Sequence, residues 1–174
     1  DKGINFGRIS VNVAGPQIQR GCLPDMVTKI LLETGMPAKH LELEVTEGFI
    51  MQQAEFAIVQ LQAIRDMGVS LAIDDFGTGY SSLSYLKLLP INTLKIDQSF
   101  VRDIPEDSND MAIANAVIAL GHSLELTVIA EGVETNDQLS FLKQAGCNEV
   151  QGYLYSRPVD AESLEQFITR LQGK

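Results

Sequence analysis

The sequence predicts an α/β fold in which parallel strands alternate with helices and close into a (β/α) barrel. Three observations support this prediction. Short apolar segments of strand character alternate with segments whose apolar residues recur at helical spacing. Strands separated by helices in this way form parallel β-α units. The strand candidates also carry polar residues at or near their carboxyl ends, where a barrel has its mouth. An open doubly wound sheet is the alternative, but helices cover both of its faces, so inward polar groups would be costly there.

Six strand candidates can be placed from their short, apolar character. They are Ile9–Val13, Leu41–Val45, Val69–Asp74, Thr93–Ile96, Leu126–Ala130 and Glu149–Tyr153. Between and after them, apolar residues at helical spacing predict five helices, over about 23–31, 54–64, 113–124, 139–145 and 164–171. Glycines follow three of these patterns directly, as expected of helix C-caps, and Asp160 is a candidate N-cap for the last one.

Composition excludes several classes of protein. The 174 residues include 13 basic and 23 acidic side chains, a net charge of −10, which argues against a binder of nucleic-acid polymers. The sequence has no apolar stretch long enough for a membrane helix and opens without a secretory signal pattern, so we expect no membrane contact from this segment. Cys22 and Cys147 form no disulfide framework or metal motif. We therefore expect a cytoplasmic location, which a membrane anchor elsewhere in the parent protein would not contradict.

Polar residues at the strand ends predict a metal site. The set that a barrel mouth would gather is Asn12, Glu44, Asp74, Asp75, Lys95, Glu131 and Gln151. Carboxylate and amide oxygens are the ligands that hard cations prefer, so Mg²⁺ or Mn²⁺ is favoured over zinc. The adjacent Asp74 and Asp75 suggest two metals, an arrangement suited to in-line displacement at phosphorus. For any one of these residues alone, a helix cap or a solvated loop charge is the simpler interpretation.

A loop of small residues over 75–82 follows the third strand candidate. Such loops at a barrel mouth act as lids or ligand clamps, although a plain turn that uses its glycines for positive φ is the alternative. Glu47 could accept hydrogen bonds from backbone N–H groups of this loop, or simply serve as a favourable charge at a helix N-terminus. We expect its side chain to lie at an exposed strand end.

Several motifs occur in an order that resembles the EAL-domain family of bacterial cyclic di-GMP phosphodiesterases. They are EVTE at 44–47, DDFGTGYSSL at 74–83, KID at 95–97, AEGVE at 130–134, QGY at 151–153 and SRP at 156–158. The resemblance covers essentially all of the chain, so we interpret 1–174 as one EAL domain or part of one. It implies a modified TIM-like barrel that cleaves cyclic di-GMP to linear pGpG with magnesium or manganese. It also implies a homodimer.

The resemblance assigns roles to individual residues. Asn12, Glu44 and Asp74 would hold one metal, and Asp75 would hold the second. Glu131 is similar to the proposed general base of the family, and Lys95 to the residue that orients the water or a phosphate oxygen.

The remaining roles are supporting ones. Glu134 and Gln151 would complete the polar shell, and Glu47 would steady the loop after Asp75. Asp97 resembles a partner of Lys95, for which a simple ion pair is the alternative. Arg157 and Pro158 resemble the segment that borders a guanine and a phosphate.

One departure from the family is large. The Glu-Ala-Leu motif that names the family does not occur in the sequence. We expect the first two barrel strands, with a metal-binding glutamate and a substrate-binding arginine, to be absent from this chain. The chain is then an N-terminally truncated EAL domain whose activity alone is impaired. The alternatives are a non-catalytic cyclic di-GMP receptor and an inactive fragment.

Overall fold

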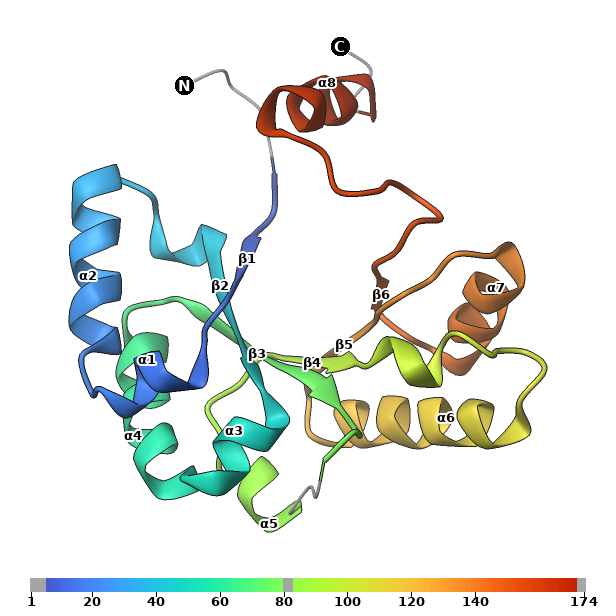
Figure 1. The fold of residues 1–174 in the computed structure, drawn as a ribbon, viewed down its shortest axis with the longest axis horizontal. Helices are drawn as coiled ribbons and strands as arrows, with labels where there is room; N and C mark the ends of the chain where they lie inside the picture. Colours follow the sequence, from blue (N-terminus) through green and yellow to red (C-terminus); the bar gives the residue numbers. More distant parts are fainter. Residues whose placement is uncertain (1–5, 80–82, 172–174) are drawn as a thin grey trace.

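The computed structural model describes residues 6–79 and 83–171, which form one parallel sheet with helices around it. The strands are β1 (Ile9–Asn12), β2 (Leu41–Thr46), β3 (Ser70–Phe76), β4 (Thr93–Ile96), β5 (Thr127–Ala130) and β6 (Glu149–Val150). They pair in the order of the sequence, β1 to β6, and every pairing is parallel. Figure 1 shows the sheet curled like part of a barrel wall, with α1 to α7 on its outside. The prediction of a TIM-like (β/α) fold is confirmed at this level. The absence of the first two barrel strands from this chain stays a prediction.

The helices connect the strands on the outside of the curl. They are α1 (Gly15–Gln19), α2 (Leu23–Thr34), α3 (Glu47–Gln52), α4 (Ala54–Asp66), α5 (Leu83–Leu86), α6 (Ser108–Ser123), α7 (Asn136–Ala145) and α8 (Ala161–Leu171), with 3₁₀ turns η1 (Ala38–His40) and η2 (Gln98–Phe100). Gly35 and Gly146 cap α2 and α7 with φ of 67° and 86°, as their positions in the sequence predicted. Asp160 accepts a hydrogen bond from the Ser163 amide at 2.8 Å, which confirms its capping role.

The hydrophobic core lies between the outer face of the sheet and the helices. Strand residues such as Val45, Ile73 and Leu94 are at most 1% exposed, and Leu61 and Ile64 of α4 are equally buried. Because side chains alternate across a strand, the neighbours of these core residues face the inside of the curl. The same alternation that builds the core therefore places Glu44 and Lys95 on the inner face.

Two strand ends differ from the prediction by more than one residue. β3 continues to Phe76, with an irregular register between Ile73 and Phe76, and Asp75 has a φ of 54°. β6 stops at Val150 because the chain turns there to bond with another loop: Val133 N–H donates to Gln151 O at 3.1 Å, and Leu154 N–H donates to Val133 O at 3.0 Å.

The C-terminal helix and the short helices complete the fold. α8 lies beyond the start of β1, away from the other helices (Figure 1). The short helices α1, α3 and α5 were not predicted, because four to six residues carry too little periodicity to be recognised. No helix in the described ranges is long and apolar enough to cross a membrane.

Candidate active site

Lys95 lies at the centre of the candidate site and pairs with three carboxylates. Its Nζ is 2.9 Å from Glu44 Oε2, 3.0 Å from Asp74 Oδ1 and 2.6 Å from Glu131 Oε1. These partners come from β2, from β3 and from the residue that follows β5, while Lys95 comes from β4 between them. Lys95 is only 2% exposed. The prediction that these four side chains converge on the inside of the sheet is confirmed, and their roles stay predictions.

Burial and charge shift the pKa values of this cluster. Burial alone would lower the pKa of Lys95, but hydrogen bonds to Glu131, Glu44 and Asp74 outweigh it and raise that pKa above its usual range. The pKa of Glu131 is also raised, because the effect of burial exceeds the opposing effect of the neighbouring Lys95. Lys95 is therefore a permanent cation at neutral pH, and Glu131 is a stronger base than an exposed glutamate.

Three of the carboxylates are arranged as hard-cation ligands would be. Asp74, Asp75 and Glu131 each offer an oxygen, and these oxygens lie within 4.8 Å of one another. Asp74 Oδ1 is buried, with Lys95 Nζ 3.0 Å away. Burial, Asp74 and Asp97 together raise the pKa of Asp75. One lysine cannot balance this much negative charge, so the oxygen-only set fits a divalent cation such as Mg²⁺ or Mn²⁺.

The backbone of Asp75 departs from regular strand geometry. Its φ of 54° lies in the left-handed region, which a residue other than glycine rarely adopts. Gly77 follows with a φ of 100°, and a Cβ there would lie 2.9 Å from the Phe100 ring. Adjacent residues of a regular strand face opposite sides of the sheet, whereas in this local conformation Asp74 and Asp75 have oxygens within 4.8 Å of each other. Residues 80–82 of the predicted loop lie outside the described residues.

Glu47 holds this loop, as predicted, but from a buried position. Its Oε2 accepts a hydrogen bond from the Gly77 amide at 2.9 Å, and its side chain packs within 3.4 Å of where a Gly79 Cβ would lie. Glu47 is 1% exposed at the start of α3. The expectation from the sequence that it sits at an exposed strand end was therefore wrong. Its loss should affect stability as well as the loop.

Asp97 does not form the expected ion pair with Lys95. The simple interpretation paired it with Lys95, but the three ion pairs of Lys95 go to other carboxylates. β4 ends at Ile96, and Asp97 caps η2 by accepting hydrogen bonds from Ser99. Burial would raise the pKa of Asp97, but hydrogen bonds from Ser99 and Asp75 lower it. Asp97 thus contacts the site through Asp75, not through Lys95.

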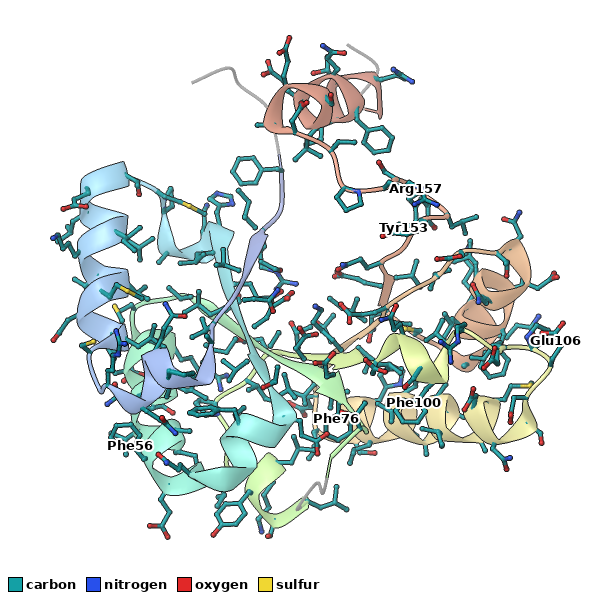
Figure 2. All side chains as sticks on the ribbon, viewed as in Figure 1. Phe56, Phe76, Phe100, Glu106, Tyr153 and Arg157 are labelled. Carbon is teal, nitrogen blue, oxygen red and sulfur yellow. The ribbon has the colours of Figure 1, made fainter. Side chains whose placement is uncertain are left out.

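The other predicted residues surround this centre. Asn12 ends β1 and stands opposite Glu44 in the β1–β2 register. Glu134, Gln151 and Pro158 line a pocket of about 290 Å³ together with Glu131 and Tyr153. Arg157 stacks on Tyr153, with its Cζ 4.5 Å from the ring centroid (Figure 2). The role of Arg157 toward substrate stays a prediction.

Glu42 is a buried polar residue that the prediction missed. It is 1% exposed on β2, two residues before Glu44. It accepts hydrogen bonds from Ser10 Oγ at 3.0 Å and Thr93 Oγ1 at 2.8 Å, and Arg8 Nε lies 3.7 Å away. The spacing of two along a strand was the available signal, because it places Glu42 on the same face as Glu44. Glu42 and its hydrogen-bonding partners thus form a second polar group on the inner face of the sheet, next to the candidate site.

The sequence matches the EAL domain family over residues 2–158. The chain belongs to the EAL domain family. It is 50% identical over 161 residues to the cyclic di-GMP phosphodiesterase NbdA of Pseudomonas aeruginosa, covering 92% of this chain and 21% of that protein. It is 48% identical over 164 residues to the bifunctional diguanylate cyclase/cyclic di-GMP phosphodiesterase MucR of the same organism, covering 94% and 24%. The chain thus spans about a quarter or less of these relatives.

Solved EAL structures share the fold. The phosphodiesterase PaMucR in complex with c-di-GMP superposes with a TM-score of 0.88 at 48% identity, covering 90% of this chain and 64% of that one. BlrP1 of Klebsiella pneumoniae, in a complex with manganese and c-di-GMP, gives a TM-score of 0.79 at 34% identity and covers 90% and 40%. These likenesses support the TIM-like fold and belong to proteins whose structures contain the nucleotide.

Proposed function

We propose that this EAL domain hydrolyses cyclic di-GMP to linear pGpG with Mg²⁺ or Mn²⁺, as part of a complete domain. The observation that carries the proposal is the convergence of four acidic residues with Lys95 on the inner face of adjacent strands. The relatives named as cyclic di-GMP phosphodiesterases and the manganese complex of BlrP1 support the substrate and the metal.

The metal ligands come from neighbouring strands. Asn12, Glu44 and Asp74 would hold one metal and Asp75 the second, with Glu131 close to them as the base. When bound, a divalent cation supplies a Lewis acid that polarises a phosphoryl oxygen and makes a water molecule more acidic. Because the acids outnumber the lysine, the cation also removes repulsion that would oppose an anionic substrate.

The side chains of the chain then carry out an in-line displacement. Glu131, whose pKa is raised, accepts a proton from the attacking water as its oxygen forms a bond to phosphorus. Lys95 remains charged, orients Glu131 at 2.6 Å and donates to a phosphate oxygen as negative charge develops. The bond from phosphorus to the ribose 3′ oxygen breaks, and that oxygen takes a proton from a solvent water molecule and leaves as the 3′ hydroxyl of pGpG. Tyr153, Arg157 and Pro158 border the nucleotide in this arrangement.

Homodimerisation is part of the proposal. The α5 region next to the loop after Asp75 exposes Leu83 (59%) and Leu88 (57%), and such apolar side chains suit an interface. We also place the domain in the cytoplasm, in line with its two free cysteines, Cys22 and Cys147.

Two carboxylate-to-amide substitutions test the function. Glu131→Gln keeps the shape of the side chain but removes the base, so pGpG formation should fall by about 10²–10⁴-fold. Asp74→Asn removes a charged ligand, so manganese affinity measured by calorimetry should fall. Glu106→Gln and Asp137→Asn make the same chemical changes at exposed positions and should alter neither quantity.

The outcomes separate the candidate functions. Retained activity in Glu131→Gln would reject its role as base, and unchanged manganese affinity in Asp74→Asn would reject the metal assignment. A complete domain that binds cyclic di-GMP with manganese present and releases no pGpG would instead be a receptor.

A further inference from the structure

The side chain of Gln138 joins two loops of the site. It lies in the first turn of α7 and is 4% exposed. Its Nε2 donates to Val101 O at 3.2 Å and Arg102 O at 3.0 Å. Its Oε1 accepts from the Glu134 amide at 2.7 Å and the Thr135 amide at 2.9 Å. A side-chain amide has two N–H donors and two acceptor positions, so every hydrogen-bonding position of this side chain is used.

The two loops that Gln138 joins both contribute to the wall of the pocket. The loop after β4 contributes Gln98, and the loop after β5 contributes Glu131, Gly132 and Glu134. The loops nearly touch at Gly132, where a Cβ would lie 2.6 Å from Gln98 Cβ. The hydrogen bonds of Gln138 reach the backbone of both loops, at the wall residue Glu134 itself and at residues one to four positions beyond the wall residues. A single buried side chain therefore fixes the separation of the two loops.

We propose that Gln138 is a positioning residue, a clamp that sets the width of this pocket and so the reach of Glu131 and Glu134 toward metal and substrate. This inference rests on the proposed function, because it treats the pocket as part of a metal-dependent site. Gln138 is neither a predicted metal ligand nor part of the pocket lining, and its side chain bonds backbone atoms, including the amide of the lining residue Glu134, so it acts through the backbone of the two loops.

A helix cap is the simpler role for Gln138, and the contacts distinguish the two roles. In a capping box, the Gln138 amide donates to Thr135 Oγ1 at 3.2 Å and the Thr135 amide donates back to Gln138 Oε1. A capping box is satisfied equally well by Glu at the position of Gln138. A glutamate carboxylate cannot donate to Val101 O or Arg102 O, whereas Thr135→Ala removes the cap hydroxyl and leaves those two bonds intact.

The experiment compares Gln138→Glu with Thr135→Ala in the same protein. Gln138→Glu keeps the capping box and breaks the clamp, and Thr135→Ala does the reverse. Gln144→Glu, at an exposed position of the same helix, controls for the added charge. Two readouts are used: manganese affinity by calorimetry, and hydrogen exchange of the amides of Phe100–Arg102 in the loop after β4. Gln138→Met, which keeps the volume without a charge, takes the place of Gln138→Glu if that variant does not fold.

We expect Gln138→Glu to weaken manganese binding by about fivefold or more and to speed exchange at Phe100–Arg102. Thr135→Ala and Gln144→Glu should stay within twofold of wild type in both readouts. The clamp would be overturned by wild-type values in Gln138→Glu, or by an equal loss in Thr135→Ala, which would make Gln138 a cap alone. If the wild-type protein binds no manganese, the proposed function fails, and the exchange comparison still decides whether Gln138 clamps the loops.

Discussion

Lys95 places one positive charge among three carboxylates from three neighbouring segments of the sheet. Removing one partner of a buried ion pair leaves uncompensated charges, which is far more costly than the net value of the pair. The cluster therefore depends on Lys95 for stability as well as for chemistry, at least while no metal ion shares the neutralisation. The contribution of Lys95 to stability can be measured separately from its contribution to activity.

We expect Lys95→Met to lower the free energy of unfolding at pH 7 by about 3–5 kcal/mol in metal-free protein. The folded state raises the pKa of Lys95, so its stabilisation is fully present below the unfolded pKa of about 10.4 and is lost as the pH rises further. Urea unfolding of both proteins should show a difference that narrows above that pH. Lys143→Met, on the exposed side of α7, should change stability little. Equal stability of Lys95→Met and wild type would mean that the cluster is not a stabilising ion-pair network.

Residue-level prediction succeeded where strand alternation decides the direction of a side chain. Glu44 and Lys95 each stand between two apolar neighbours, so their inward direction follows from the period of two. Asp75 and Asp97 could not be placed in this way. The first has a left-handed backbone, and the second lies beyond the end of its strand, where alternation no longer applies. Contacts between loops, such as those of Gln138, depend on tertiary packing that no local pattern contains.

At the scale of elements, the loops at the carboxyl ends of the strands are tied together by backbone contacts. The turn at 151–154 bonds to both sides of Val133, and Gly152 permits this approach because it has no side chain. In the same way, the missing side chain of Gly132 lets Gln98 approach closely. Strands and longer helices were predictable from their periodicity, but the early end of β6 was not, since it results from this contact with a distant loop.

Gly152→Ala tests the contact between the last two loops. A Cβ at this position would lie 2.1 Å from Val133 O and 2.4 Å from Val133 N, and backbone atoms cannot yield as a flexible side chain does. We expect a loss of about 1–3 kcal/mol in unfolding free energy and at least a tenfold lower rate of pGpG formation. Gly48→Ala in α3 meets no atom within 4 Å and should be neutral or slightly stabilising. Normal stability and turnover in Gly152→Ala would show that the loops tolerate separation.

Glu47→Ala tests the connection between α3 and the loop after Asp75. The substitution leaves the Gly77 amide without its charged acceptor, so we expect a destabilisation of about 1–3 kcal/mol together with lower turnover. Glu47→Gln keeps an oxygen acceptor and should lose less of both. Glu55→Ala, in the exposed first turn of α4, is the matched control. Lost turnover with unchanged stability would mean that Glu47 serves the loop alone.

At the scale of the whole molecule, the curled sheet decides which face can carry chemistry. Helices cover the outside, so polar groups are tolerated only on the inside, where strand ends converge. The sequence predicted this curvature through its inward acids and lysine, because a flat sheet covered on both faces would have left them buried without partners. It could not predict how far the described residues curl, since curvature accumulates from the twist and stagger of every strand pair.

The two ends of the sheet give a prediction about the whole molecule. Within the described residues, β1 pairs only with β2, and β6 only with β5. The side chains of Ile9 and Val11 on β1 are 50% and 45% exposed. An apolar edge strand with unpaired N–H and C=O groups is a template for pairing with another chain. We therefore expect the 174-residue protein to self-associate as its concentration rises.

A lysine on the edge strand should reduce this association, because charged side chains on an edge oppose pairing. We expect Val11→Lys to shift the protein toward monomer in sedimentation velocity at matched concentrations. Val59→Lys adds the same charge at a position of α4 that is 64% exposed and away from the sheet edge, so it should leave the association unchanged. If both lysines act alike, net charge and not the β1 edge governs association. If the wild-type protein stays monomeric at every concentration, the edge is already protected, and strand pairing between copies plays no part in its behaviour.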